Sequence, residues 1–204
     1  MFIQVIEGRT SDPEAMRRRV EVWERELQPG AIGYLGSAGG CTADGSFILA
    51  ARFEDSDAAM RNGQRPEQTE WWRETEKCFD GPATFHDTED VHVMAHGRLE
   101  DAHFVQVMEG HVSDRARADE LERESDPILA QVRPDLLGSI TAFYGADGFA
   151  DIAYFTSEQE AREAEKREMP PEMAEKFGEW EHVMKVDRYL DIREPWLTAG
   201  PAGR

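Results

Sequence analysis

Apolar and polar residues alternate over the first few positions of the chain, and the same alternation returns near its middle. The stretch Phe2–Asp12 reads FIQVIEGRTSD and the stretch Phe104–Asp114 reads FVQVMEGHVSD, with seven of eleven positions identical at an offset of 102 residues. Alternating β-branched and aromatic residues predict a strand at each place. Identity at one fixed offset indicates that the second half of the chain duplicates the first.

A helix signal follows the first strand. Ser11-Asp12-Pro13-Glu14 supplies a cap residue, a first-turn proline and an early acid. The apolar residues that follow share one helical face, and they are Met16, Val20, Trp23 and Leu27. In the second half, Pro127 removes a backbone donor, which predicts that the corresponding helix kinks or ends near Ser125.

Further elements complete a repeating order in each half. In the first half, IGYLGSAGG (32–40) and FILAARF (47–53) flank an Ala-Asp-Gly turn and predict a hairpin. A second helix is predicted from about Pro66, and a last strand within residues 83–94. The order strand, helix, strand, strand, helix, strand is that of a ferredoxin-like unit, so the predicted fold class is α+β with two tandem βαββαβ units.

A ferredoxin-like unit covers one sheet face with helices and leaves the other face bare. We therefore expect the two units to pack sheet face to sheet face on one chain, as a monomer with pseudo-twofold symmetry that can associate further. The predicted boundaries are 1–94 for the first unit, 95–103 for a polar connector, 104–197 for the second unit and 198–204 for a tail.

Composition narrows the classes of partner. The formal net charge of −19 is spread over both halves and opposes binding to nucleic acid or to an anionic membrane. Cys41 and Cys78 form no C-x-x-C pair, and the N-terminus resembles no signal peptide, so we expect a cytoplasmic protein. His92, His96 and His103 cluster in the sequence without a metal-ligand pattern, and no metal site is predicted.

The order of elements, the duplicated first strand and the Trp-bearing second helix resemble the dimeric α+β barrel superfamily. Within it, the chain is most similar to domains of the antibiotic-biosynthesis-monooxygenase type, written as two tandem copies. The resemblance implies a monooxygenase that needs no cofactor and acts on an aromatic or quinol-like small molecule in a pocket between the sheets. Haem-degrading relatives carry an Asn where this chain has Gly8 and a ligating His on the second helix, and no His lies between Trp72 and Phe85.

Candidate site residues come from the predicted strand faces. If Ile3 and Val5 meet the helices, then Gln4 points into the cavity between the sheets, as does Gln106 in the second copy. Arg52 and its counterpart Tyr154 differ between the halves and could orient an anionic or phenolic ligand. The alternatives are a structural role for the glutamines and a solvated ion pair for Arg52.

Aromatic residues point to the first half as the active one. Trp71 and Trp72 stand where the second half has Lys176 and Phe177, and Tyr34 lies on a central strand. We expect Arg52 and Gln4 to be catalytic, and Gln106, Tyr154, Tyr34 and Trp71 to bind the ligand. The alternative function is a ligand-binding or stress-response module of the same fold that catalyses nothing.

Overall fold

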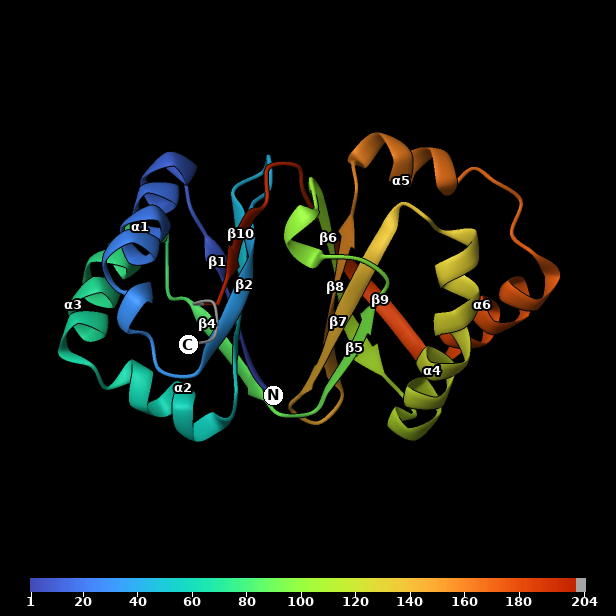
Figure 1. Ribbon diagram of the computed structural model, residues 1–204, viewed down its shortest axis with the longest axis horizontal. Helices are drawn as coiled ribbons and strands as arrows, with labels where there is room; N and C mark the ends of the chain where they lie inside the picture. The colour runs from blue at the N-terminus through green and yellow to red at the C-terminus, as the bar shows by residue number, and fades with distance from the viewer. Residues whose placement is uncertain (201–204) are drawn as a thin grey trace. The chain divides into compact units, whose positions relative to one another are not determined.

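Two compact units make up the structure, and helices cover one face of the sheet in each (Figure 1). The computed structural model describes residues 1–200. The first unit contains residues 1–91 and the segment that begins at residue 194, and the second contains residues 92–193. Among the helices of the described residues, none combines the length and apolar character needed to cross a bilayer.

The first unit has a five-stranded antiparallel sheet in the order β10-β2-β3-β1-β4. Its strands are β1 (Phe2–Arg9), β2 (Tyr34–Cys41), β3 (Ser46–Phe53), β4 (Thr84–Thr88) and β10 (Trp196–Ala199). Its helices are α1 (Pro13–Glu26), α2 (Ser56–Gly63) and α3 (Pro66–Thr75), with the short 3-10 turns η1 (Gln28–Gly30) and η2 (Glu76–Cys78).

The second unit repeats this plan with the strand order β5-β7-β8-β6-β9. Its strands are β5 (Val91–Ala95), β6 (Phe104–Val112), β7 (Leu136–Tyr144), β8 (Gly148–Phe155) and β9 (Met184–Ile192). Its helices are α4 (Arg115–Val132), α5 (Glu158–Ala164) and α6 (Pro171–Val183), and η3 (Leu99–Asp101) is a 3-10 turn. The predicted α+β fold with two tandem ferredoxin-like units is confirmed.

The fifth strand of each sheet comes from the segment that follows the other repeat. Strand β5 follows the first repeat and lies in the second sheet, whereas β10 follows the second repeat and lies in the first. The predicted connector 95–103 therefore begins at the last residue of β5, and the predicted tail 198–204 begins inside β10. Boundaries drawn from the sequence cut into both strands.

Helix α1 buries the face that the sequence predicted, and helix α4 is longer than the sequence predicted. Asp12 caps α1 by accepting a hydrogen bond of 2.8 Å from the Ala15 N–H, and Met16 is fully buried. Helix α4 continues through Pro127, so of the two predicted outcomes, a kink or an end near Ser125, the end is wrong. An interior proline costs about 3 kcal/mol, and burial of leucines on both sides of it, among them the fully buried Leu121, offsets that cost.

Strands β1 and β6 turn the face that carries Gln4 and Gln106 toward the helices. Phe2 packs with Trp23 of α1, and Ile6 packs with Met16, so Gln4 between them also faces the helices. The prediction that Ile3 and Val5 meet the helices is therefore wrong. Both faces of this strand are apolar, and Ile3 and Val5 are fully buried, so alternation alone cannot tell one face from the other.

Strand β10 completes the first unit through side chains as well as backbone. The Tyr34 hydroxyl hydrogen-bonds the Ser37 hydroxyl at 2.8 Å and also contacts the Thr198 hydroxyl. Ser37 and Thr198 lie 2.8 Å apart, which closes a ring of three hydroxyl groups. Tyr34 and Ser37 are buried, so these partners satisfy groups that water does not reach freely.

Replacing Thr198 with Val should lower the free energy of unfolding by about 1–2 kcal/mol, because buried Tyr34 and Ser37 would each lose a hydrogen-bond partner. Urea unfolding of the full chain measures the change. Thr69→Val, on the exposed side of α3, is the control and should stay within about 0.5 kcal/mol. Equal effects of the two variants would contradict a stabilising role for the hydroxyl ring.

Candidate functional site

Each unit encloses a cavity between its sheet and its own helices. The cavity of the second unit has a volume of about 560 Å³, and that of the first about 570 Å³. Volumes of this size suit a small organic molecule. The sequence pattern predicts a pocket on the opposite sheet face, whereas these cavities are lined by residues of the helix-facing side.

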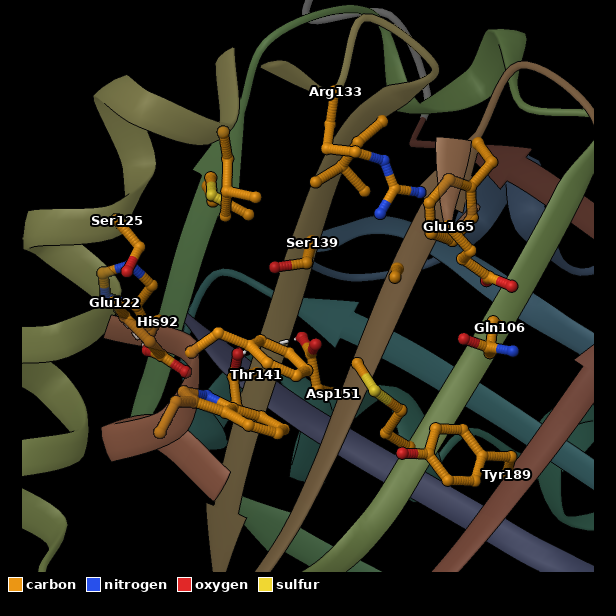
Figure 2. Close-up of a pocket in the computed structure, with 18 of the residues that line it drawn as sticks. His92, Gln106, Glu122, Ser125, Arg133, Ser139, Thr141, Asp151, Glu165 and Tyr189 are labelled. Atoms are coloured by element: carbon orange, nitrogen blue, oxygen red, sulfur yellow. Dashed lines mark hydrogen bonds and ion pairs between the residues drawn. The ribbon is translucent and has the colours of Figure 1, made fainter. Parts of the chain in front are cut away.

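A carboxyl group lies on the floor of the second cavity. Asp151 of β8 sits opposite Thr141 of β7, and the Thr141 hydroxyl donates a hydrogen bond of 3.0 Å to Asp151 Oδ1 (Figure 2). Ser139, two residues earlier on β7, donates a second bond. Burial raises the pKa of Asp151 to about 6 against the effect of these two donors. Part of its surface stays open to the cavity, so a ligand can reach it.

A second carboxyl group enters the cavity from helix α4. The Glu122 side chain is only 12% exposed, and burial together with the nearby Asp151 charge raises its pKa to about 8. Thr141 hydrogen-bonds this side chain too, and Glu122 Oε2 is buried without a hydrogen-bond donor. At neutral pH the cavity thus holds one ionised and one largely protonated carboxyl group, joined through Thr141.

Aromatic side chains line another part of the second cavity. Phe177 and Trp180 of α6 stack with ring centroids 5.9 Å apart and an interplanar angle of 10°. Tyr189 of β9 also lines the cavity, and it and Phe177 remain exposed to solvent. Flat, accessible rings of this kind favour a flat aromatic ligand.

The remaining polar groups of the second cavity bind one another. Gln106 donates a hydrogen bond of 2.8 Å to Asp191 Oδ1, and Arg162 donates one of 2.5 Å to Asp191 Oδ2. Arg133 pairs with Asp135 at 2.7 Å. Gln106, a predicted ligand contact, does line the cavity, but its amide N–H is used within the sheet.

The first cavity brings together three of the predicted residues, Gln4, Tyr34 and Trp71. Gln4 donates to Asp87 Oδ1 at 2.9 Å, which repeats the Gln106–Asp191 pair. The Trp71 indole N–H donates to the Arg19 carbonyl at 2.7 Å, which ties α3 to α1. These three side chains therefore support the first unit in addition to lining its cavity.

Arg52 and Tyr154 lie outside both cavities. Arg52 pairs with Ile3 in the sheet register and Tyr154 with Val105, so both occupy the strand face that points away from the helices. Neither residue lines either cavity. Gln4 and Arg52 are thus on opposite faces of one sheet, and the structure does not unite these two predicted catalytic residues in one site.

Neither Glu122 nor Asp151 is among the site residues predicted from the sequence. A signal was available in the repeat. By the shared sheet register, Asp151 corresponds to Leu49, and at the offset of 102 residues Glu122 corresponds to Val20. Val20 and Leu49 are buried and line the first cavity. Two cavity positions that are aliphatic in the first half and acidic in the second therefore distinguish the second cavity from the first.

Comparisons with known proteins agree with the fold. No family model matches the sequence, and no curated protein matches it. A solved structure of a candidate monooxygenase from Lactobacillus acidophilus has a TM-score of 0.69 and 14% identity, with 97% of this chain and 96% of that chain covered. For a candidate monooxygenase from Fusobacterium nucleatum the TM-score is 0.75 and the identity 8%, with 97% and 94% covered.

An anthrone oxidase-like protein is also similar, with a TM-score of 0.63 and 11% identity, and the match covers 96% of this chain and 88% of that one. Identities this low show a shared fold. The predicted resemblance to tandem α+β barrel proteins of the monooxygenase type is thereby confirmed at the level of the fold.

Asp151→Asn should stabilise the protein at neutral pH. The folded-state pKa of Asp151, about 6, lies above its ordinary value of 3.8, so ionising this group costs stability as the pH rises from about 4 to 6. Asparagine has no charge and can still accept the Thr141 hydrogen bond. The free energy of unfolding of the variant should exceed that of the parent by between about 1 and 3 kcal/mol at pH 7.5.

The difference between variant and parent should shrink as the pH falls toward 4.5, and urea unfolding at the two pH values measures it. Asp147→Asn, on the exposed β7–β8 turn, is the matched control and should show no such trend. A constant difference at both pH values would mean that the pKa of Asp151 is not raised.

Proposed function

We propose that the protein is an oxidoreductase that adds oxygen from O2 to a flat phenolic or quinol-like molecule in the cavity of the second unit. The observation that carries this proposal is Asp151, a carboxylate on a deep cavity floor, held by Thr141 and Ser139 and open to a ligand. The similar fold of two candidate monooxygenases and of an anthrone oxidase-like protein supports the class of reaction by analogy.

Asp151 has the properties that a general base for a phenol requires. With a pKa of about 6 it is mostly ionised at pH 7, and it is a stronger base than an exposed aspartate. The hydrogen bonds from Thr141 and Ser139 fix its orientation. Removing the phenolic proton produces an electron-rich phenolate, which can deliver electrons to O2 itself.

The reaction balances without any other electron donor. Asp151 accepts the hydroxyl proton, a ring carbon of the phenolate bonds to O2, and the proton returns to the peroxide oxygen. Asp151 then takes the hydrogen from the same ring carbon, the O–O bond breaks, and hydroxide leaves with that proton as water. One phenol and one O2 give one quinone and one water, and the substrate supplies all four electrons.

The sequence pattern favours the first unit as the active one, whereas the proposed reaction is placed in the second unit. The first cavity has Val20 and Leu49 where the second has Glu122 and Asp151. The first cavity has nearly the same volume as the second, and it also has an aromatic wall, formed by Trp23, Tyr34 and Trp71. These features suit the binding of an aromatic molecule, as the alternative function of a non-catalytic ligand-binding module requires. The first cavity has no carboxyl group at the position equivalent to Asp151.

Asp151→Asn should lower the rate of oxygen uptake with an active phenol or anthrone by about 10² to 10⁴-fold, the usual contribution of a general base. The assay combines an oxygen electrode with mass spectrometry of ¹⁸O in the product, above the spontaneous rate. Binding of the same compound, followed by Trp fluorescence, should change by less than about threefold, because the variant keeps the cavity and removes only the base.

Asp147→Asn is the control for activity, because this exposed turn residue lies outside the cavity. Full activity in the Asp151 variant would show that another group removes the proton. A parent protein that binds the aromatic panel without consuming O2 would favour the ligand-binding alternative.

A further inference from the structure

The geometry points to a divalent cation site of the zinc type formed by His92 of β5 with Asp119 and Glu122 of α4, in the wall of the second cavity. This inference stands independently of the proposed reaction. One ligand atom from each of the three side chains lies within 4.8 Å of the other two. His92 and Glu122 also line the cavity, so further coordination positions would face a bound molecule (Figure 2).

The spacing of the three groups fits one small cation. His92 Nδ1 lies 3.7 Å from Asp119 Oδ1 and 3.5 Å from Glu122 Oε2. Ligands of a tetrahedral zinc ion lie about 2.0–2.2 Å from the metal, and so about 3.3–3.6 Å from one another. The two distances from His92 fall in or close to this range, and a small approach of the two carboxyl groups, whose ligand atoms lie within 4.8 Å of each other, would complete the site. Positions 119 and 122 are three apart on α4 and share a helix face.

The ligand types of the three groups are suited to a cation. Nδ1 of His92 faces both carboxyl groups, and a neutral imidazole nitrogen is a common metal ligand. Asp119 and Glu122 add carboxylate oxygens, which zinc also accepts. Glu122 Oε2 is buried and accepts no hydrogen bond, and a metal ion would supply the partner that this oxygen lacks.

The two halves of the chain show that the fold does not need these residues. At the offset of 102 residues, Asp119 and Glu122 correspond to Arg17 and Val20. The His96 N–H donates to the Leu137 carbonyl as the Gly200 N–H donates to the Leu35 carbonyl, so His92 corresponds to Trp196. The first unit forms the same sheet and helices with an arginine, a valine and a tryptophan at these places.

The guanidinium groups of Arg115 and Arg123 lie close to the cluster. They offer another explanation for the position of Asp119, which is pairing with positive charge. Arg123 contacts Asp119 Oδ2, and Arg115 Nη1 lies 3.6 Å from Asp119 Oδ1. Without a metal, Asp119 forms an ion-pair network with these two arginines, next to His92 and Glu122. With a metal bound, Oδ1 would exchange Arg115 for the cation while Oδ2 keeps Arg123. The nitrogen ligand favours zinc, and cobalt as its spectroscopic substitute, over magnesium, calcium or manganese, which prefer oxygen.

Titration calorimetry of the full, metal-stripped chain with Zn²⁺ tests the site, and Co²⁺ provides a visible spectrum of the bound ion. We expect one equivalent of Zn²⁺ to bind. His92→Gln and Glu122→Gln should each weaken this binding at least tenfold and remove the Co²⁺ bands. Mg²⁺ at the same concentration should not compete.

His96→Gln is the matched control. His96 also reaches from the end of β5 to α4, where it contacts Asp126 at 2.6 Å, but within residues 1–200 no third ligand completes that pair. This variant should bind Zn²⁺ as the parent does. Circular dichroism confirms that each variant is folded. Absence of stoichiometric binding to the parent, or equal binding to all variants, would overturn the site and leave the ion-pair network as its explanation.

Discussion

The register of strands β1 and β6 within their sheets is the constraint on which the rest of the structure depends. Strand β1 pairs with β3 and β4, and β6 pairs with β8 and β9, all antiparallel. Because side chains alternate, a slip by one residue would exchange the two faces of the sheet. The register therefore decides that Gln4 lines a cavity under the helices and that Arg52 faces the other way.

Much of this arrangement could be predicted from the sequence, and the failures have a common physical cause. The duplication, the element order and the buried face of α1 follow from local patterns, because one side of that helix is polar. Strand faces could not be assigned in this way, since Ile3 and Ile6 on opposite faces are both buried. The carboxyl cluster is assembled from α4, β5 and β8, which are far apart in sequence, and local patterns carry no information about such proximity.

Duplication allows one copy to carry groups that would weaken a single-domain protein. A buried carboxyl group with a raised pKa reduces stability at neutral pH, and the second unit contains both Glu122 and Asp151. The first unit fills the equivalent positions with Val20 and Leu49, which favour folding. The copies have thus diverged within one backbone frame, with aliphatic side chains at these positions in one and buried carboxyl groups in the other.

The exchange of outer strands has a consequence for how such a chain can evolve and be engineered. Because β5 is built into the sheet of the second unit and β10 into that of the first, cutting the chain at the repeat boundary leaves each fragment with a strand that belongs to the other. A crossover that shuffles halves between related genes would carry a foreign edge strand each time. Inheritance as an undivided whole is therefore favoured over modular recombination, even though the sequence looks like two separable modules.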